Sequence, residues 1–148
     1  MVIQDLLHDL PPFLYNFQGW GLLVMRLIWG TVIVLYGWRM VKNPLHWMDR
    51  GGKPSGFPSF VQVIGAFTIF GGGIAIILGF LTPLAALGLA GAMAIALWLH
   101  VSHGEPLIKK QPDAPGDSYE ASLVYLAIAV LFLFVGPGNL SLDSLLFR

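Results

Sequence analysis

Long apolar stretches, separated by short polar breaks, dominate the chain. No Lys, Arg, Asp or Glu occurs at any position from Pro54 to Gly104. A membrane span needs about 20 apolar residues to cross roughly 30 Å of hydrocarbon. Four stretches meet or approach that length, at about 19–41, 57–80, 83–101 and 119–135. Because a backbone in lipid must satisfy its own hydrogen bonds, each stretch is predicted to be a helix.

Proline and glycine mark the breaks between these helices. Asn43-Pro44 ends the first one, since a residue that precedes proline disfavours the helical conformation. Thr82 is predicted to cap the third helix, and Pro83 suits its first turn. A short amphipathic tail at about 141–147 is expected to lie on the membrane surface. The prediction is therefore a single all-α domain over 1–148, a four-helix transmembrane bundle.

The composition agrees with this pattern and removes several function classes. Hydrophobic residues make up 56% of the chain and charged residues 11%, whereas soluble domains carry about 25% charged residues. The formal net charge is zero, so no excess positive charge is available to bind a nucleic-acid backbone. Cysteine is absent, which excludes disulfides, zinc–thiolate sites and Cys-ligated iron–sulfur clusters in this chain. No pattern typical of a hydrolase is present.

Basic residues in the short loops predict the orientation in the membrane. Six of them lie in the polar loops 42–56 and 104–118 or next to these loops, and only Arg148 lies at the other side. The six are Arg39, Lys42, Arg50, Lys53, Lys109 and Lys110. Because cytoplasmic loops carry the excess of Lys and Arg, both polar loops are predicted to be cytoplasmic and both termini to lie outside.

Small residues recur every three or four positions in the second and third helices. Such stripes allow two helix backbones to approach closely, so these two helices are predicted to form a tight pair. The second helix carries Gly65, Thr68, Gly72, Ala75 and Gly79, and the third carries Gly88, Ala92 and Ala96.

Polar side chains at the cytoplasmic end of the helices are the first candidate site, because such groups are costly within a membrane and often functional. We expect Tyr36, Arg39, Gln62, His100 and Glu120 to gather there. Three interpretations are open. The cluster is a cap that holds the loops, a site for a quinone head group that His100 and Tyr36 would hydrogen-bond, or a metal or haem site using His100 and His103. Two histidines give only weak support to the last, so no metal ligands are assigned.

A second candidate cluster is expected at the outer end. Arg26 is the only formal charge well inside the first helix. A buried guanidinium needs partners, and its planar fork suits carboxylate and carbonyl oxygens. We therefore expect Arg26 to form an ion pair with Asp143 or to bind the backbone carbonyls of 136–139. The favoured interpretation is a structural staple that fastens the tail to the bundle.

Several sequence runs together resemble the DoxX family of small four-helix membrane proteins. The resemblance reaches from about 21 to 146 and is most specific in the final run. The runs are 26–30 (RLIWG), 34–38 (VLYGW), 72–82 (GGIAIILGFLT), 83–87 (PLAAL), His100 and 136–143 (GPGNLSLD). The chain departs from the family pattern in three places: 67–70 lacks an acidic residue, Tyr36 replaces a common His, and Pro83 replaces a common Arg.

The resemblance implies an integral membrane subunit of a bacterial redox or electron-transfer complex, with quinone as its candidate cofactor. DoxX-like proteins look like partners of oxidoreductases, including thiosulfate:quinone oxidoreduction and terminal oxidase assemblies. Any enzymatic role would then be that of a quinone-linked oxidoreductase subunit, although no independent catalytic motif is present. The alternative is a purely structural or accessory subunit that packs against pigments, lipids or other subunits of a larger complex, for example a photosynthetic one. Haem or a pigment is favoured less than quinone as a cofactor, and the expected protein partners are other membrane subunits or further copies of the chain. A small-molecule transporter is favoured least, because broken helices and inverted repeats are not evident.

Overall fold

The computed structural model describes residues 12–49, 52–113 and 118–147, and this part of the chain is helical, with no β-strand. Its helices are α2 (Pro12–Val41), α3 (Ser59–Leu78), α4 (Thr82–Ser102), α5 (Glu120–Val135) and the short α6 (Leu142–Leu146). The all-α prediction is confirmed. The predicted bounds are close to those observed except at the start of α2, which begins seven residues earlier than expected.

Three helices are long and apolar enough to cross a membrane. They are Phe17–Val41 within α2, Ser59–Leu78 and Thr82–Ser102. Helix α5 is apolar but has only 16 residues, a length of about 24 Å at 1.5 Å per residue, against about 30 Å for the hydrocarbon layer. The chain is therefore an integral membrane protein, and α5 is a shorter apolar helix beside the three spans.

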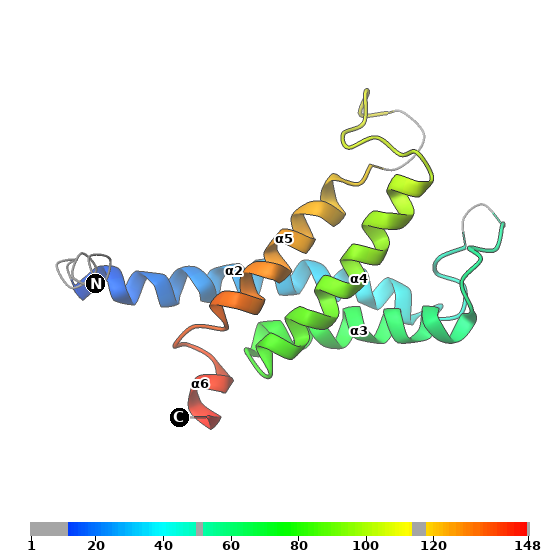
Figure 1. Ribbon diagram of the computed structural model, residues 1–148. Coiled ribbons are helices and arrows are strands. Elements are labelled where there is room, and N and C mark those ends of the chain that lie inside the picture. Colours follow the sequence, from blue (N-terminus) through cyan, green and yellow to red (C-terminus); the bar gives the residue numbers. More distant parts are fainter. Residues whose placement is uncertain (1–11, 50–51, 114–117, 148) are drawn as a thin grey trace.

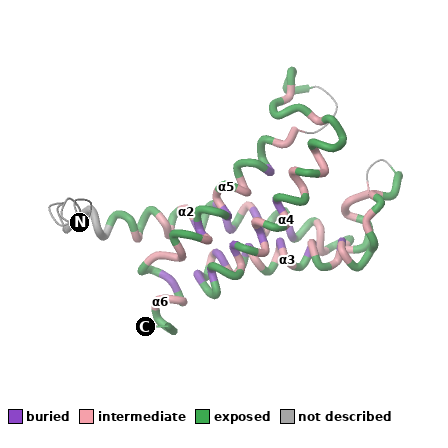
Figure 2. The backbone as a smooth tube through the Cα atoms, viewed as in Figure 1, coloured by how far each residue is buried: buried purple, intermediate pink, exposed green. Residues whose placement is uncertain are grey.

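The helices form two antiparallel pairs that cross. Helices α2 and α3 lie side by side, and the α4–α5 pair is inclined across them (Figure 1). The buried residues concentrate where the two pairs cross (Figure 2). Trp29 and Ile33 of α2, Ile76 of α3, Leu89 of α4 and Phe132 of α5 form the centre of this core.

Glycines set the distance between neighbouring helices. A Cβ atom at Gly72 would lie 2.9 Å from Cγ of Leu89, and one at Gly88 would lie 3.1 Å from Cγ2 of Thr68. These contacts confirm the predicted close approach of α3 and α4. The approach of α2 to α3 is closer still, because a Cβ at Gly37 would lie 2.6 Å from both the backbone nitrogen and the Cα of Phe70.

The turn between α3 and α4 contains two residues in the left-handed region. Gly79 has φ 65° and ends α3, with its N–H bonded to the carbonyl of Ile76. Leu81 has φ 46°, which is costly for a residue with a branched side chain. Such a conformation persists only where surrounding contacts hold it in place, and the C-terminal segment supplies them, as described below.

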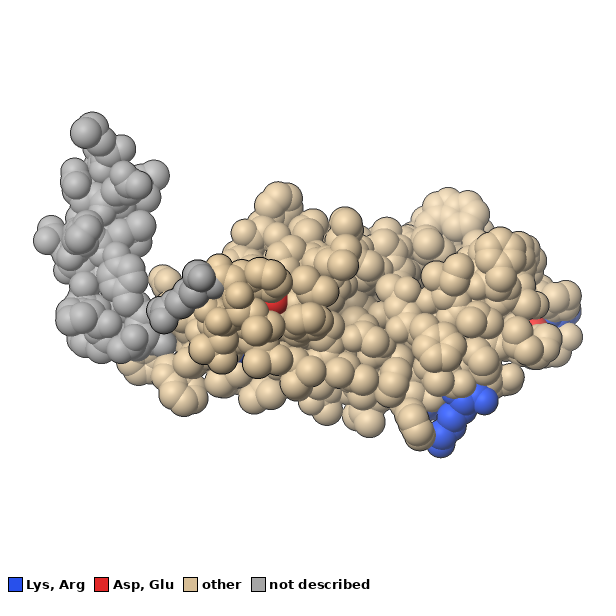
Figure 3. All heavy atoms as spheres, turned by 90° about the horizontal axis from the view of Figure 1, so that it is seen from below, with Lys and Arg blue, Asp and Glu red and all other residues tan. Residues whose placement is uncertain are grey.

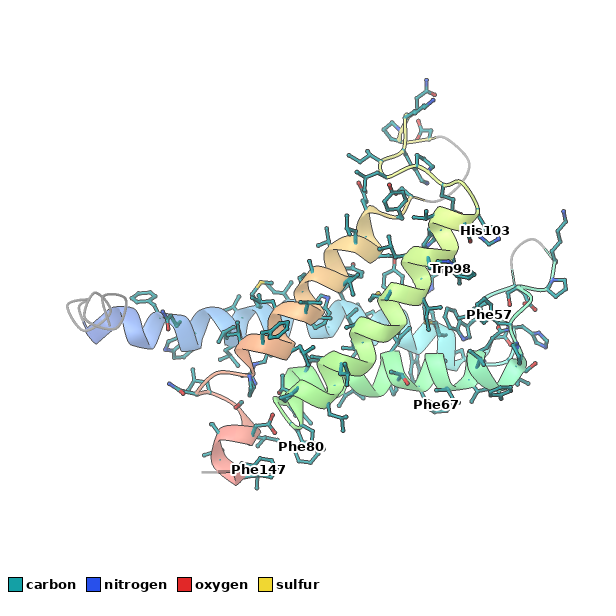
Figure 4. All side chains as sticks on the ribbon, in the orientation of Figure 1. Phe57, Phe67, Phe80, Trp98, His103 and Phe147 are labelled. Atoms are coloured by element: carbon teal, nitrogen blue, oxygen red, sulfur yellow. The ribbon has the colours of Figure 1, made fainter. Side chains whose placement is uncertain are left out.

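The outer surface is apolar and rich in aromatic residues. One face carries almost no charged side chains (Figure 3). Phe67 of α3 points away from the neighbouring helices (Figure 4) and is 55% exposed. Trp98 of α4, Trp38 of α2 and Leu84 of α4 are also exposed. In a chain with three long apolar helices, this surface is the one that contacts lipid.

Candidate functional site

The polar side chains occupy two ends of the molecule, which we name by their chain segments. The loop end comprises the described parts of the two connections, 42–49, 52–58, 103–113 and 118–119, and the turn end comprises the turn 79–82 together with 136–143. Figure 1 shows the two polar loops on one side and the α3–α4 turn near α6 on the other. The sequence placed one candidate cluster at each end.

At the loop end, Gln62 holds the α2–α3 connection. Its side chain is 3% exposed. Its Oε1 accepts a hydrogen bond from the Met48 N–H at 3.2 Å, and its Nε2 donates to Ser55 Oγ at 3.2 Å and to the Phe57 carbonyl at 3.3 Å. The Trp47 indole N–H donates to the Gln62 carbonyl at 2.7 Å. All of these partners belong to the adjacent loop, so Gln62 orders that loop.

The same loop contains one partly buried carboxylate, that of Asp49. Its Oδ1 accepts the Ser55 backbone N–H at 3.0 Å, and its Oδ2 lies 3.0 Å from Nδ1 of His46. These interactions, the Ser55 hydrogen bond first, lower the pKa of the Asp49 carboxyl below its usual value. The ionised form of Asp49 is therefore the one that fits the folded loop.

His100 forms a pair that the sequence analysis did not anticipate. Its Nδ1 hydrogen-bonds with Oε2 of Glu105, and both side chains are largely buried, at 16% and 14% exposed. Glu105 lies just past the C-terminal end of α4, five residues after His100, where the turn at Gly104 (φ 72°) brings the chain back. His103 is exposed, and its ring Nδ1 lies 2.6 Å from the Leu99 carbonyl. Among the described residues, no three His, Asp or Glu side chains are grouped as metal ligands.

The other predicted members of the loop-end cluster lie nearer the surface. Tyr36 is 50% exposed and makes an edge contact with Tyr125 of α5, with ring centroids 6.2 Å apart. Arg39 and Glu120 are exposed, and no ion pair joins these two described residues. Gln62 therefore binds groups of the α2–α3 connection, whereas His100 pairs with Glu105. Glu105 and Tyr125 were not predicted, and they join the candidate residues of the loop end.

At the turn end, Arg26 is 1% exposed and reaches across to the C-terminal segment. Its Nη2 donates a hydrogen bond to the Leu140 carbonyl. Its Nη1 lies against Gly79, where a Cβ atom would collide with it and would also lie 2.6 Å from Cβ of Ser141. Only glycine fits beside this guanidinium, and the carbonyl it binds is one residue beyond the predicted range 136–139.

Asp143 acts on the start of α4. Its carboxylate accepts the backbone N–H of Leu81 at 2.6 Å and that of Thr82 at 2.8 Å, while its own N–H donates to the Gly79 carbonyl at 2.8 Å. The expectation that the Thr82 side chain caps α4 was wrong, because Asp143 from the far end of the chain supplies the cap. Asp143 and Arg26 are neighbours in one cluster, without direct ion-pair contact between these two described residues.

Several buried donors at and near the turn end have no hydrogen-bond partner among the described residues. They are Nε and Nη1 of Arg26, Nε1 of Trp29 and Oγ1 of Thr82. Trp29 lies one helical turn from Arg26 on α2 and stacks on Phe132, with centroids 5.7 Å apart. Unpaired buried donors are unusual in folded proteins, and no pattern in the sequence predicted them.

The comparisons with known proteins give one match. The model of the DoxX family matches residues 21–102, more than half of the chain. The match covers α3 and α4 and most of α2, including Arg26, Gly79 and His100. No curated protein matches the chain, and no solved structure matches it.

Proposed function

This chain belongs to the DoxX family, and on that premise we propose that it is an integral subunit of a bacterial membrane redox or electron-transfer complex. In this proposal the partner oxidoreductase supplies the electrons. The chain supplies a membrane surface and, at its loop end, one proton-exchanging pair that contacts a quinone. The proposal includes α5 as a fourth, short span, with the polar loops in the cytoplasm.

The His100–Glu105 pair is the observation that carries this proposal. It lies at the C-terminal end of α4, and both side chains are largely buried. Histidine changes its charge between pH 5 and 8, and a carboxylate that binds one ring nitrogen fixes the tautomer. A quinone takes up two protons with two electrons when it is reduced. The pair is suited to deliver one of those protons to a quinone oxygen at the membrane boundary.

A second function is supported by the outer surface. Trp38, Phe60, Phe67, Leu84 and Trp98 are each more than half exposed. Large exposed apolar areas in a membrane protein suit packing against lipids, pigments or other subunits. Under this alternative, the chain is a purely structural subunit and the His100–Glu105 pair only closes the α4–α5 loop.

The first experiment is a mild-detergent purification from native membranes, followed by mass spectrometry of the bound proteins and quinones. We expect a stoichiometric oxidoreductase to remain bound. A chain that purifies without an oxidoreductase, a quinone, a pigment or any other subunit would contradict both functions.

Variants in the purified complex then separate the two functions. We expect His100→Ala and Glu105→Gln to lower quinone-dependent turnover about tenfold or more, because general acid–base groups typically contribute factors of about 100 to 10,000. His103→Ala is the matched control, because His103 lies one turn away, is exposed and contacts a backbone carbonyl. Unchanged turnover in all three variants would favour the purely structural subunit.

A further inference from the structure

We propose that the C-terminal end of α2 binds the head group of an anionic phospholipid. In this site Arg39 and Lys42 hold the lipid phosphate, and Trp38 lies beside the start of an acyl chain. The inference depends on the chain being an integral membrane protein, and it is independent of the proposed quinone function.

Two cations without an acidic partner lie at the end of α2. Arg39 is in the last turn of the helix, Lys42 follows its last residue, and both side chains are exposed. Among the described residues, the ion pairs are formed by histidines alone, so no carboxylate neutralises either cation. On the face in Figure 3, the visible Lys and Arg side chains stand toward one end of a broad apolar surface. An anion from outside the chain can therefore bind both cations.

Trp38 fixes the depth of Lys42 in the membrane. The Lys42 Nζ lies 5.4 Å from the centre of the Trp38 ring, which is a cation–π contact. The Trp38 ring in turn packs on Phe70 of α3, with ring centroids 5.9 Å apart. Tryptophan is enriched at the boundary between hydrocarbon and head groups. The Lys42 ammonium is therefore held at the level where lipid phosphates lie.

An apolar track runs from this end along one face of α2. Leu35 and Ile28 precede Trp38 by three and ten residues, and these spacings place the three side chains on one side of the helix. Leu35 and Ile28 are each 60% exposed. The stretch from Ile28 to Trp38 spans about 15 Å, which is half of a hydrocarbon layer of roughly 30 Å. An acyl chain of a lipid bound at Lys42 can therefore follow this track through its own leaflet.

The chemistry of the site favours a lipid with a net negative charge. A guanidinium binds phosphate oxygens through its planar fork, and an ammonium binds them as a point charge. In a zwitterionic lipid, the choline or ethanolamine cation opposes both contacts. Phosphatidylglycerol and cardiolipin carry no such cation, and basic residues beside a membrane span attract anionic lipids. A soluble anion would use the two cations but leave the apolar track without a partner.

Tryptophan quenching by brominated phospholipids tests the proposal in the full-length protein. The protein is reconstituted in phosphatidylcholine vesicles with increasing fractions of brominated phosphatidylglycerol or brominated phosphatidylcholine. The Trp38 signal is the difference between the wild type and Trp38→Phe. The matched control is the Trp98 signal, obtained with Trp98→Phe, because Trp98 is 64% exposed and makes no cation–π contact among the described residues.

We expect Trp38 to favour phosphatidylglycerol about fivefold or more, since each basic residue contributes a factor of about five at an anionic surface. Trp98 is expected to show less than half of that preference. Equal quenching of Trp38 by the two brominated lipids would overturn the proposal.

Charge variants distinguish this site from the overall charge of the loop end. Arg39→Gln and Lys42→Gln, each compared with its own Trp38→Phe double variant, are expected to lose at least half of the preference. Lys110→Gln removes the same charge at an exposed position of the other connection and is expected to keep it. An equal loss in all three variants, or no loss in the first two, would contradict the site. Inorganic phosphate is expected to leave the quenching unchanged; if it abolishes the preference, the ligand is a free anion and the lipid proposal is wrong.

Discussion

Replacing Asp143 by alanine tests how the C-terminal segment stabilises the α3–α4 turn. The carboxylate caps α4 through two hydrogen bonds of 2.6 and 2.8 Å to the N–H groups of Leu81 and Thr82. Loss of a helix N-cap costs about 0.5–2 kcal/mol, and loss of a negative charge near a helix N-terminus costs up to about 1 kcal/mol more. The left-handed Leu81 (φ 46°) loses a contact that holds it. We therefore expect Asp143→Ala to lower the free energy of unfolding by about 1–3 kcal/mol.

For a chain of this length, that change corresponds to a fall in Tm of about 3–10 °C. The measurement is thermal unfolding in detergent, followed by circular dichroism. Asp143→Asn keeps one oxygen acceptor and should show about half of the effect, while Asp113→Ala, at an exposed loop position, should leave Tm unchanged. An Asp143→Ala protein that melts within 1 °C of the wild type would refute the assignment of Asp143 as the cap of α4.

Three further changes probe other parts of the structure. Gly37→Ala should destabilise the protein by about 1–3 kcal/mol, because its Cβ would lie 2.6 Å from the Phe70 backbone. The control is Gly71→Ala, which has open space around it and should be neutral or slightly stabilising in the same denaturation assay. Gln62→Met should lose about 1–3 kcal/mol and speed proteolysis within the 42–58 loop; an unchanged cleavage rate would contradict the assigned role of Gln62. The pKa of Asp49 is lower in the folded loop than in the unfolded chain, so the stabilisation of the loop by Asp49 is present above the unfolded pKa of about 3.9. That stabilisation is lost as pH falls through the lower folded pKa. Protection of the loop from proteolysis should therefore decline below about pH 4 in the wild type but not in Asp49→Asn.

Apolar length and loop chemistry predicted the helices well, because both are local properties. The ends of α3, α4 and α5 fall within two residues of prediction, and both ends of α3, the start of α4 and the end of α5 lie next to Gly or Pro. The glycine stripe predicted the α3–α4 contact. It did not predict the closer α2–α3 contact, because the glycines of α2 that form it, Gly30 and Gly37, are seven residues apart and make no stripe of three- and four-residue spacings.

The candidate sites were harder to predict, because depth in the membrane does not determine which way a side chain points. Gln62 was assigned to a cluster with His100 by depth alone, yet its amide faces its own loop. The prediction for Arg26 was closer to the structure, because depth in the membrane placed its side chain beside the segment that follows α5. The capping of α4 by Asp143, 61 residues along the chain from Thr82, depends on tertiary docking that no local pattern encodes.

The two ends of the molecule are held together in different ways, and this difference bears on function. At the turn end, Arg26 joins α2 to the C-terminal segment, and Asp143 joins that segment to α3 and α4. At the loop end, Gln62 and His100 each bind within their own connection, and the described ring contact there between the two helix pairs is Tyr36 with Tyr125. Movement of one helix pair against the other therefore disrupts fewer polar contacts at the loop end. If the His100–Glu105 pair has the proposed role, it lies at the end that fewer polar contacts hold between the helix pairs, while the buried cluster at the turn end joins three helices to the C-terminal segment.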